Sequence, residues 1–158
     1  MRIQVAMILP LEARSVPLVR RTVATALSSA GVAEDCVGEV EVALSEACTN
    51  VYRHAGESAS YEVVITIGDE RLTVDVLDSG GGFDGEKAAS ADMAELDAEG
   101  GRGIALMRAL SDRAVFDTVT DGGGGSVHLM KNLRWADGGA GWPRDTEAAL
   151  DGSPPKSS

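Results

Sequence analysis

The chain has 158 residues, with 25 acidic against 14 basic side chains and a formal net charge of -11. This length is typical of one domain, and this charge would repel a phosphate backbone, so we expect no direct nucleic-acid ligand. The apolar run before Pro10 is too short for a signal peptide or a membrane span, so we expect a cytoplasmic protein without a membrane anchor.

The N-terminal part of the chain predicts a strand followed by two helices. Residues 3–9 are apolar and bounded by a proline, which suits a short strand. Apolar side chains at helical spacing predict a helix that starts with Ser15 as its cap and ends at Gly31. A second helix is expected from about residue 33 to His54, with an apolar stripe formed by Val37, Val40, Leu44, Ala47 and Val51.

Cys36 and Cys48 both fall in the second helix. They lie twelve residues apart along it, too far to be bridged within the helix. We therefore expect both to be reduced thiols that behave as small buried apolar side chains.

The remainder predicts a strand hairpin, a lid, a helix and two further strands. Strands are expected at 61–67 and 72–77, joined by hairpin residues, and again at 114–119 and 126–132. Residues 84–100 have few large apolar side chains and are expected to form a mobile lid. A helix follows from the glycines at 100–103 to Leu110.

This order of elements predicts an α+β fold, a two-layer sandwich in which helices cover one face of a mostly antiparallel sheet. The expected domain covers residues 1–133. Residues 134–158 are rich in Gly, Asp, Pro and Ser without an apolar period, so we expect a disordered C-terminal tail.

Three sites along the chain could carry chemistry, and the first is on the second helix. A spacing of four residues places Glu46 and Asn50 side by side on one helix face, and His54 continues the row. A carboxylate and an amide oxygen at the margin of a core could act as a general base and as a ligand of Mg²⁺. The alternative is the ordinary polar flank of an amphipathic helix.

The second site is Asp78, at the end of a predicted strand, followed by glycines that include Gly80 and Gly82. Glycines allow a planar ligand to approach the backbone, and a buried Asp78 could accept a hydrogen bond from an exocyclic amine of a purine. The alternative is a glycine-rich turn capped by an aspartate.

The third site is Gly101-Arg102-Gly103 at the start of the last predicted helix. Backbone N–H groups at a helix N-terminus form an anion site that suits phosphates. The alternative is an entry turn that needs glycine for its conformation. Together the three sites would supply a cation ligand, a base pocket and a phosphate cradle, and neither a P-loop nor a Rossmann fingerprint competes with them.

Residues 3–133 resemble the Bergerat-fold ATPases related to gyrase and histidine kinases, and within them the anti-sigma-factor serine/threonine kinases. The row of Glu46, Asn50 and His54 is similar to the N box of that family. The runs Asp78-x-Gly-x-Gly and Gly101-x-Gly103 are similar to its two glycine boxes. Gly125-Ser126-x-x-Leu129 resembles its terminal strand, with serine in the place of threonine.

The resemblance implies a role for each of these residues. Asn50 would hold Mg²⁺, Glu46 would take the proton from the acceptor serine, and Asp78 would bind the adenine amine of ATP. Further nucleotide contacts would come from Gly80, Gly82, Gly101, Arg102, Gly103 and Ser126.

It also implies partners. The chain would be a homodimer that sequesters a sigma factor and phosphorylates an anti-anti-sigma antagonist of the STAS type. Arg20, with Arg21 as the alternative, would contact both partners.

One departure from the family pattern favours a second class of function. Residues 86–99 contain Lys87 as their only basic residue against five acidic ones, and an acidic lid would close unfavourably over a triphosphate. A regulatory binding protein that uses ATP without transferring phosphate is therefore the alternative in a partner-switching system. A detached ATPase half of a histidine kinase fits less well, because no phosphoacceptor helix precedes residue 3.

Overall fold

The computed structural model of the chain describes residues 1–54, 59–78, 98–118 and 125–136. In chain order its elements are β1 (Arg2–Pro10), α1 (Ser15–Ala30), α2 (Glu34–His54), β2 (Ser60–Gly68), β3 (Arg71–Asp78), α4 (Ala98–Leu110), β4 (Arg113–Thr118) and β5 (Gly125–Asn132). The strands and helices predicted from the sequence are all present, with ends that differ by a few residues.

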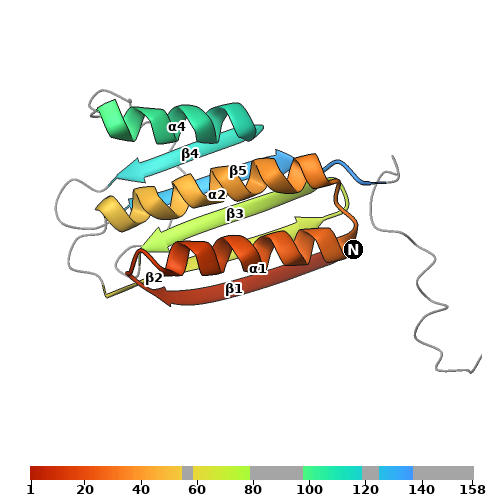
Figure 1. Cartoon of the computed structure of the whole chain (residues 1–158), viewed down its shortest axis with the longest axis horizontal. Coiled ribbons are helices and arrows are strands. Elements are labelled where there is room, and N and C mark those ends of the chain that lie inside the picture. Colours follow the sequence, from red (N-terminus) through yellow and green to blue (C-terminus); the bar gives the residue numbers. More distant parts are fainter. Residues whose placement is uncertain (55–58, 79–97, 119–124, 137–158) are drawn as a thin grey trace, which may run out of the picture.

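The five described strands form one antiparallel sheet in the order β1-β2-β3-β5-β4. The three described helices lie on the same face of this sheet, α1 over β1 and β2 and α2 over the middle strands (Figure 1). The predicted two-layer α+β sandwich is confirmed. Because the described helices share one face, the apolar core lies between the two layers.

Strand β2 shows how the sequence builds the inner face of the sheet. Its side chains alternate, so that every second residue points toward the helices. The inward residues are exposed by 2% or less and are Tyr61, Val63, Ile65 and Ile67. The hairpin to β3 has Asp69 and Glu70 as its two loop residues, as the turn chemistry predicted.

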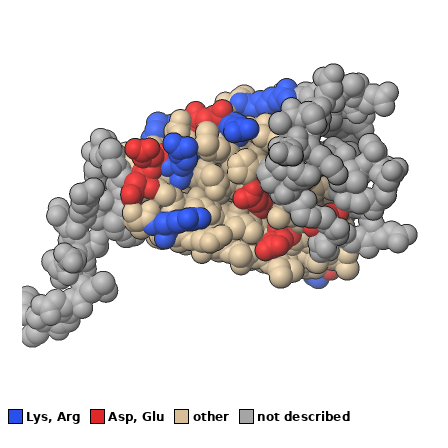
Figure 2. Space-filling view, turned by 180° about the vertical axis from the view of Figure 1, so that it is seen from behind, with Lys and Arg blue, Asp and Glu red and all other residues tan. Residues whose placement is uncertain are grey.

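The outer face of the sheet carries polar side chains among apolar ones. Figure 2 views the molecule from this side and shows basic and acidic residues interspersed on a largely uncharged surface. Asp75 on β3 and His128 on β5 are cross-strand partners there, with Nδ1 of the imidazole 2.5 Å from the carboxylate. This pair lies on the opposite side of the sheet from the helices.

Helix α2 buries the predicted stripe of Val37, Val40, Leu44, Ala47 and Val51, each exposed by 5% or less. Gly38 lies within this continuous helix, although glycine in a helix interior costs roughly 0.5–1 kcal/mol relative to alanine. Cys36 and Cys48 are free and buried, which confirms the expectation of reduced thiols.

Helix α1 ends as predicted but starts differently. Its last residue is Ala30, and Gly31 caps it with a φ of 92°, in the left-handed region that glycine adopts without strain. Ser15 is the first helical residue and not the cap, because its hydroxyl is used elsewhere. Its Oγ donates to the carbonyl of Glu12 at 2.7 Å and lies 2.6 Å from the hydroxyl of the buried Tyr61.

Helix α4 begins at Ala98, three residues before the glycine that was expected at its start. Alanine and glutamate favour helix, which extends it toward the N-terminus. The predicted lid lies outside the described residues, except for its last residues, which form the first turn of α4. In the part of the chain that the structure covers, no helix has the length and apolar character needed to cross a membrane.

The first residues of the segment expected as a tail pack on the domain. The amide of Ala33 donates a hydrogen bond to the carbonyl of Arg134 at 2.8 Å. The amide of Ala136 donates one to the carbonyl of Gly31 at 3.0 Å. Trp135 is buried between these contacts, with its indole N–H bonded to the carbonyl of Asp69 in the hairpin. Residues 137–158 lie outside the described residues.

Candidate active site

The structure brings the carboxylate of the second helix to the glycines of α4. Helices α2 and α4 lie against each other (Figure 1). A Cβ atom added at Gly103 would lie 2.7 Å from Oε2 of Glu46, so this carboxylate occupies the space that a side chain at 103 would need. Two motifs that are far apart in the sequence therefore form one site.

Asn50 lies one turn after Glu46 on α2, and both side chains are partly buried at the edge of the apolar stripe. The side chain of His54 lies outside the described residues. The described residues contain no group of three or more His, Cys, Asp or Glu side chains that could hold a metal ion. Mg²⁺ needs no such group when phosphates and water supply most of its ligands, so a single amide oxygen such as that of Asn50 would be enough on the protein side.

Asp78 closes β3 and is only 5% exposed. It is the cross-strand partner of Tyr61, whose side chain points toward the helices, so Asp78 shares that face. A nearly buried carboxylate at a strand end can select a ligand that offers a hydrogen-bond donor. Gly80 and Gly82, the other predicted members of this motif, lie outside the described residues.

A buried polar cluster supports the inner side of this strand end. The hydroxyl of Tyr61 forms hydrogen bonds with the hydroxyl of Ser15 at the start of α1 and with the thiol of Cys48 on α2. Burial raises the pKa of Cys48 to about 12 and also raises the pKa of Tyr61, so both groups stay protonated near neutral pH. Sequence reasoning missed this cluster, because nothing in the strand pattern distinguishes a tyrosine from any other inward residue.

Two further predicted nucleotide contacts, Ser126 and Arg102, lie on β5 and on α4. Ser126 is paired with Leu77, one residue before Asp78, and successive strand residues face opposite sides of the sheet. The structure therefore does not bring Ser126 beside Asp78, and its nucleotide contact stays a prediction. Arg102 lies on α4 next to Gly103, with an exposed side chain.

Arg20 and Glu46 line one open hollow of about 460 Å³ on the helical side of the molecule. Nε of Arg20 on α1 lies 3.9 Å from Oε1 of Glu41 on α2, and both side chains are about 40% exposed. The residues that line the hollow are Arg20, Gly38, Glu41, Val42, Ser45 and Glu46. The predicted partner-binding arginine and the predicted base thus share a surface.

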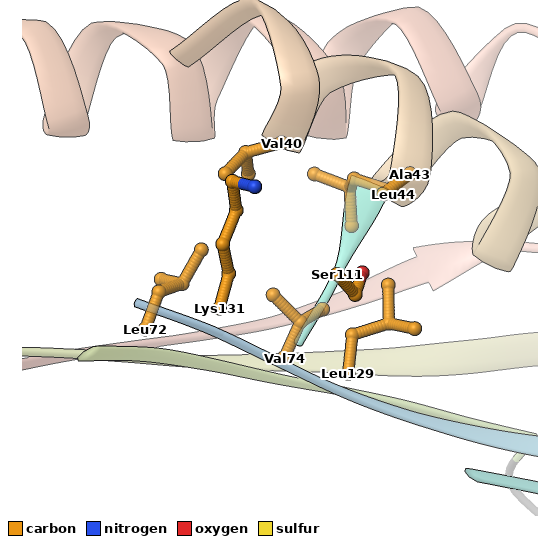
Figure 3. A pocket seen from close by; sticks show the side chains of 8 residues that line it. All are labelled: Val40, Ala43, Leu44, Leu72, Val74, Ser111, Leu129 and Lys131. Carbon is orange, nitrogen blue, oxygen red and sulfur yellow. The ribbon is translucent and has the colours of Figure 1, made fainter. Parts of the chain in front are cut away.

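A second cavity, between α2 and the sheet, is too small to bind a ligand (Figure 3). Its volume is about 10 Å³, room for about one water molecule, and its walls are nearly all apolar. Lys131 lies beside it and donates to the carbonyl of Leu110 at 2.6 Å, at the end of α4. The same ammonium pairs with Glu39 on α2 at 2.5 Å, so it holds the C-terminal end of α4 against α2 and the sheet.

The comparison with known proteins points to one family. The family described as histidine kinase-like ATPase domain matches residues 9–131. The serine-protein kinase RsbW of Staphylococcus epidermidis is 30% identical over 141 residues, which cover 82% of this chain and 87% of that protein. The protein of the same name from Bacillus cereus strain AH187 is 35% identical over 83 residues, 51% of this chain and 52% of that protein.

The coverage differs between these relatives, since the chain spans about half the length of the Bacillus cereus protein that it matches. A crystal structure of the RsbU and RsbW domains of a Mycobacterium tuberculosis protein superposes with a TM-score of 0.55 at 17% identity. That alignment covers 83% of this chain and 32% of the other chain. At this identity the likeness shows the fold, and the arrangement of layers described above agrees with it.

Proposed function

The chain belongs to the histidine kinase-like ATPase family, in the group of anti-sigma-factor serine kinases that includes RsbW, and from this premise we propose that it transfers phosphate from ATP to a partner protein. The acceptor is a serine or threonine of an anti-anti-sigma antagonist of the STAS type. The same chain sequesters a sigma factor, and the antagonist releases that sigma factor by exchanging with it. ATP is bound with Mg²⁺ between α2, the end of β3 and α4.

The observation that carries this proposal is that Glu46 lies against Gly103 of α4 and also lines an open hollow together with Arg20. A kinase of this kind needs a base that reaches both the phosphate end of its nucleotide and the hydroxyl of its protein substrate. Glu46 would reach the phosphate end of the nucleotide because it lies against Gly103 of α4. It would reach the substrate hydroxyl through the open hollow that it lines. Asn50, one turn later, would hold the metal that Mg·ATP brings.

The test is a transfer assay with defined proteins. Each STAS-domain protein from the same cells is purified and incubated with this chain, Mg²⁺ and radiolabelled ATP. We expect one of them to be labelled on serine or threonine, and we expect a sigma factor to be retained by the chain until its unlabelled antagonist is added. Nucleotide binding without transfer to any STAS protein would favour the non-catalytic binding protein instead.

Replacing Asp78 tests the adenine contact. Asp78→Asn exchanges an acceptor for a donor at a nearly buried position, so ATP binding should weaken by roughly 1–3 kcal/mol. Calorimetric titration with ATP measures this. Asp75→Asn is the matched control, because Asp75 lies three residues earlier on the outer face of the sheet and should leave ATP affinity unchanged. Equal affinities of Asp78→Asn and the wild type would remove Asp78 from the site.

We also propose that two copies associate through β1 and α1. Strand β1 is an edge of the sheet among the described strands, and Ile8 on it and Leu18 on α1 are 78% and 59% exposed. An exposed strand edge with apolar side chains favours pairing with a second chain. Sedimentation should show a dimer at tens of micromolar, on the order of a usual assay concentration. The charged variant Ile8→Lys should be monomeric, and a monomeric wild type would contradict the proposal.

A further inference from the structure

The glycine at position 38 has no explanation within the described chain. Gly38 lies inside α2, where glycine destabilises a helix relative to alanine. A Cβ atom at this position would meet no described atom within 4 Å, and among the described glycines only Gly31 has a positive φ. Neither close packing nor backbone conformation therefore requires a glycine here.

Gly38 forms part of the floor of the hollow that leads to Glu46. Val42 follows one turn later on α2 and is 42% exposed, and Ser45 follows after it. The hydroxyl of Ser45 donates to the carbonyl of Glu41 at 2.8 Å and so is turned back onto its own helix. On α2 the lining of the hollow therefore consists of Gly38 and two short side chains, Val42 and Ser45, together with the carboxylates of Glu41 and Glu46.

The charged groups that line the hollow have opposite signs. Arg20 is held only loosely, because its Nε lies 3.9 Å from Oε1 of Glu41 and both side chains are partly exposed. An acidic side chain of a partner can therefore replace Glu41 at the guanidinium. Glu46 is the group that would accept a proton from a hydroxyl.

We propose that Gly38 is a specificity position, at which the backbone of the partner segment that carries the acceptor hydroxyl passes close over α2. This inference rests on the proposed function and adds a description of the substrate. The segment lies extended along the hollow, with an acidic side chain at Arg20 and its serine or threonine at Glu46. The rise from Glu41 to Glu46 along the helix is about 7–8 Å, which places the acidic residue about two or three positions from the hydroxyl.

Substitution of Gly38 tests this directly. Gly38→Leu fills the floor of the hollow, so the KM for the STAS-domain protein labelled in the transfer assay should rise on the order of 10- to 100-fold. Gly38→Ala should give a smaller rise in the same direction. Affinity for ATP should not change, and the melting temperature should stay equal or increase, because both replacements favour helix.

Ser29→Leu is the control, since it adds the same bulk at an exposed position near the end of α1, away from the hollow. A normal KM for Gly38→Leu would overturn this inference and leave the proposed kinase function intact. This inference would also be overturned, with the kinase function intact, if Gly38→Leu lost ATP affinity or folding while Gly38→Ala transferred phosphate as the wild type does. A wild type that labels no STAS-domain protein would overturn the proposed function and this inference with it.

Discussion

Glu46→Gln should lower the rate of phosphate transfer by about 10²–10⁴, the usual contribution of a general base. Glutamine keeps the shape of the side chain and its contact with Gly103, but it cannot accept the proton of the acceptor hydroxyl. Binding of ATP and of the sequestered partner should change little. Single-turnover transfer of labelled phosphate measures the rate, and a pull-down of the sigma factor measures the binding.

Glu41→Gln is the matched control for this variant. Glu41 lies on the same helix and lines the same hollow, but it faces Arg20 and not α4. Its replacement should leave the rate at saturating substrate within a few-fold of the wild type. If Glu46→Gln transfers phosphate at the normal rate, Glu46 is not the base.

Gly103→Ala should lower the transfer rate by about 10², without unfolding the protein. The added methyl group would lie 2.7 Å from Oε2 of Glu46, so the carboxylate has to move. A displacement of about 1 Å at a reacting group can cost this much rate. The helix itself gains from the change, because alanine is favoured over glycine in a helix by about 1 kcal/mol. Transfer at saturating ATP and the melting temperature are the two measurements.

Gly101→Ala provides the comparison, because a Cβ at that position meets no described atom within 4 Å. Because Gly101 is itself an expected nucleotide contact, this variant should raise the KM for ATP, but its transfer rate at saturating ATP should stay well above that of Gly103→Ala. In the double variant of Gly103→Ala with Glu46→Gln the two losses should not add, since both act on one carboxylate. Fully additive losses would show that Gly103 acts independently of Glu46.

The elements of this fold could be predicted because their signals are local. The apolar stripe of α2 repeats at helical spacing, and the hairpin of β2 and β3 has a turn with polar and glycine residues between alternating strands. That Glu46 and Asn50 share one face of α2 could be predicted for the same reason, as a four-residue spacing places them together. Asp78 was found because a strand pattern ends on it.

The contacts between distant segments could not be predicted. Nothing near Glu46 in the sequence indicates that its carboxylate lies over Gly103, because that contact depends on how α2 and α4 pack. Lys131 is 8% exposed on the inner side of β5, where its residue type favours the surface. Burial is tolerated there because its ammonium has both a carboxylate and a carbonyl as partners. Ser15 was expected as a helix cap from its local position in the sequence. Its hydrogen bond with Tyr61 could not be predicted, because it depends on tertiary packing.

If the proposed function holds, the contact between Glu46 and Gly103 would also link two binding equilibria. A nucleotide that holds α4 in the position described here would also hold the carboxylate of Glu46 toward the hollow, so bound ATP would favour the arrangement that receives the partner. Thermodynamic reciprocity then requires that the partner raise the affinity for ATP by the same factor. A single glycine without a side chain would thus make the occupancy of each site depend on the other.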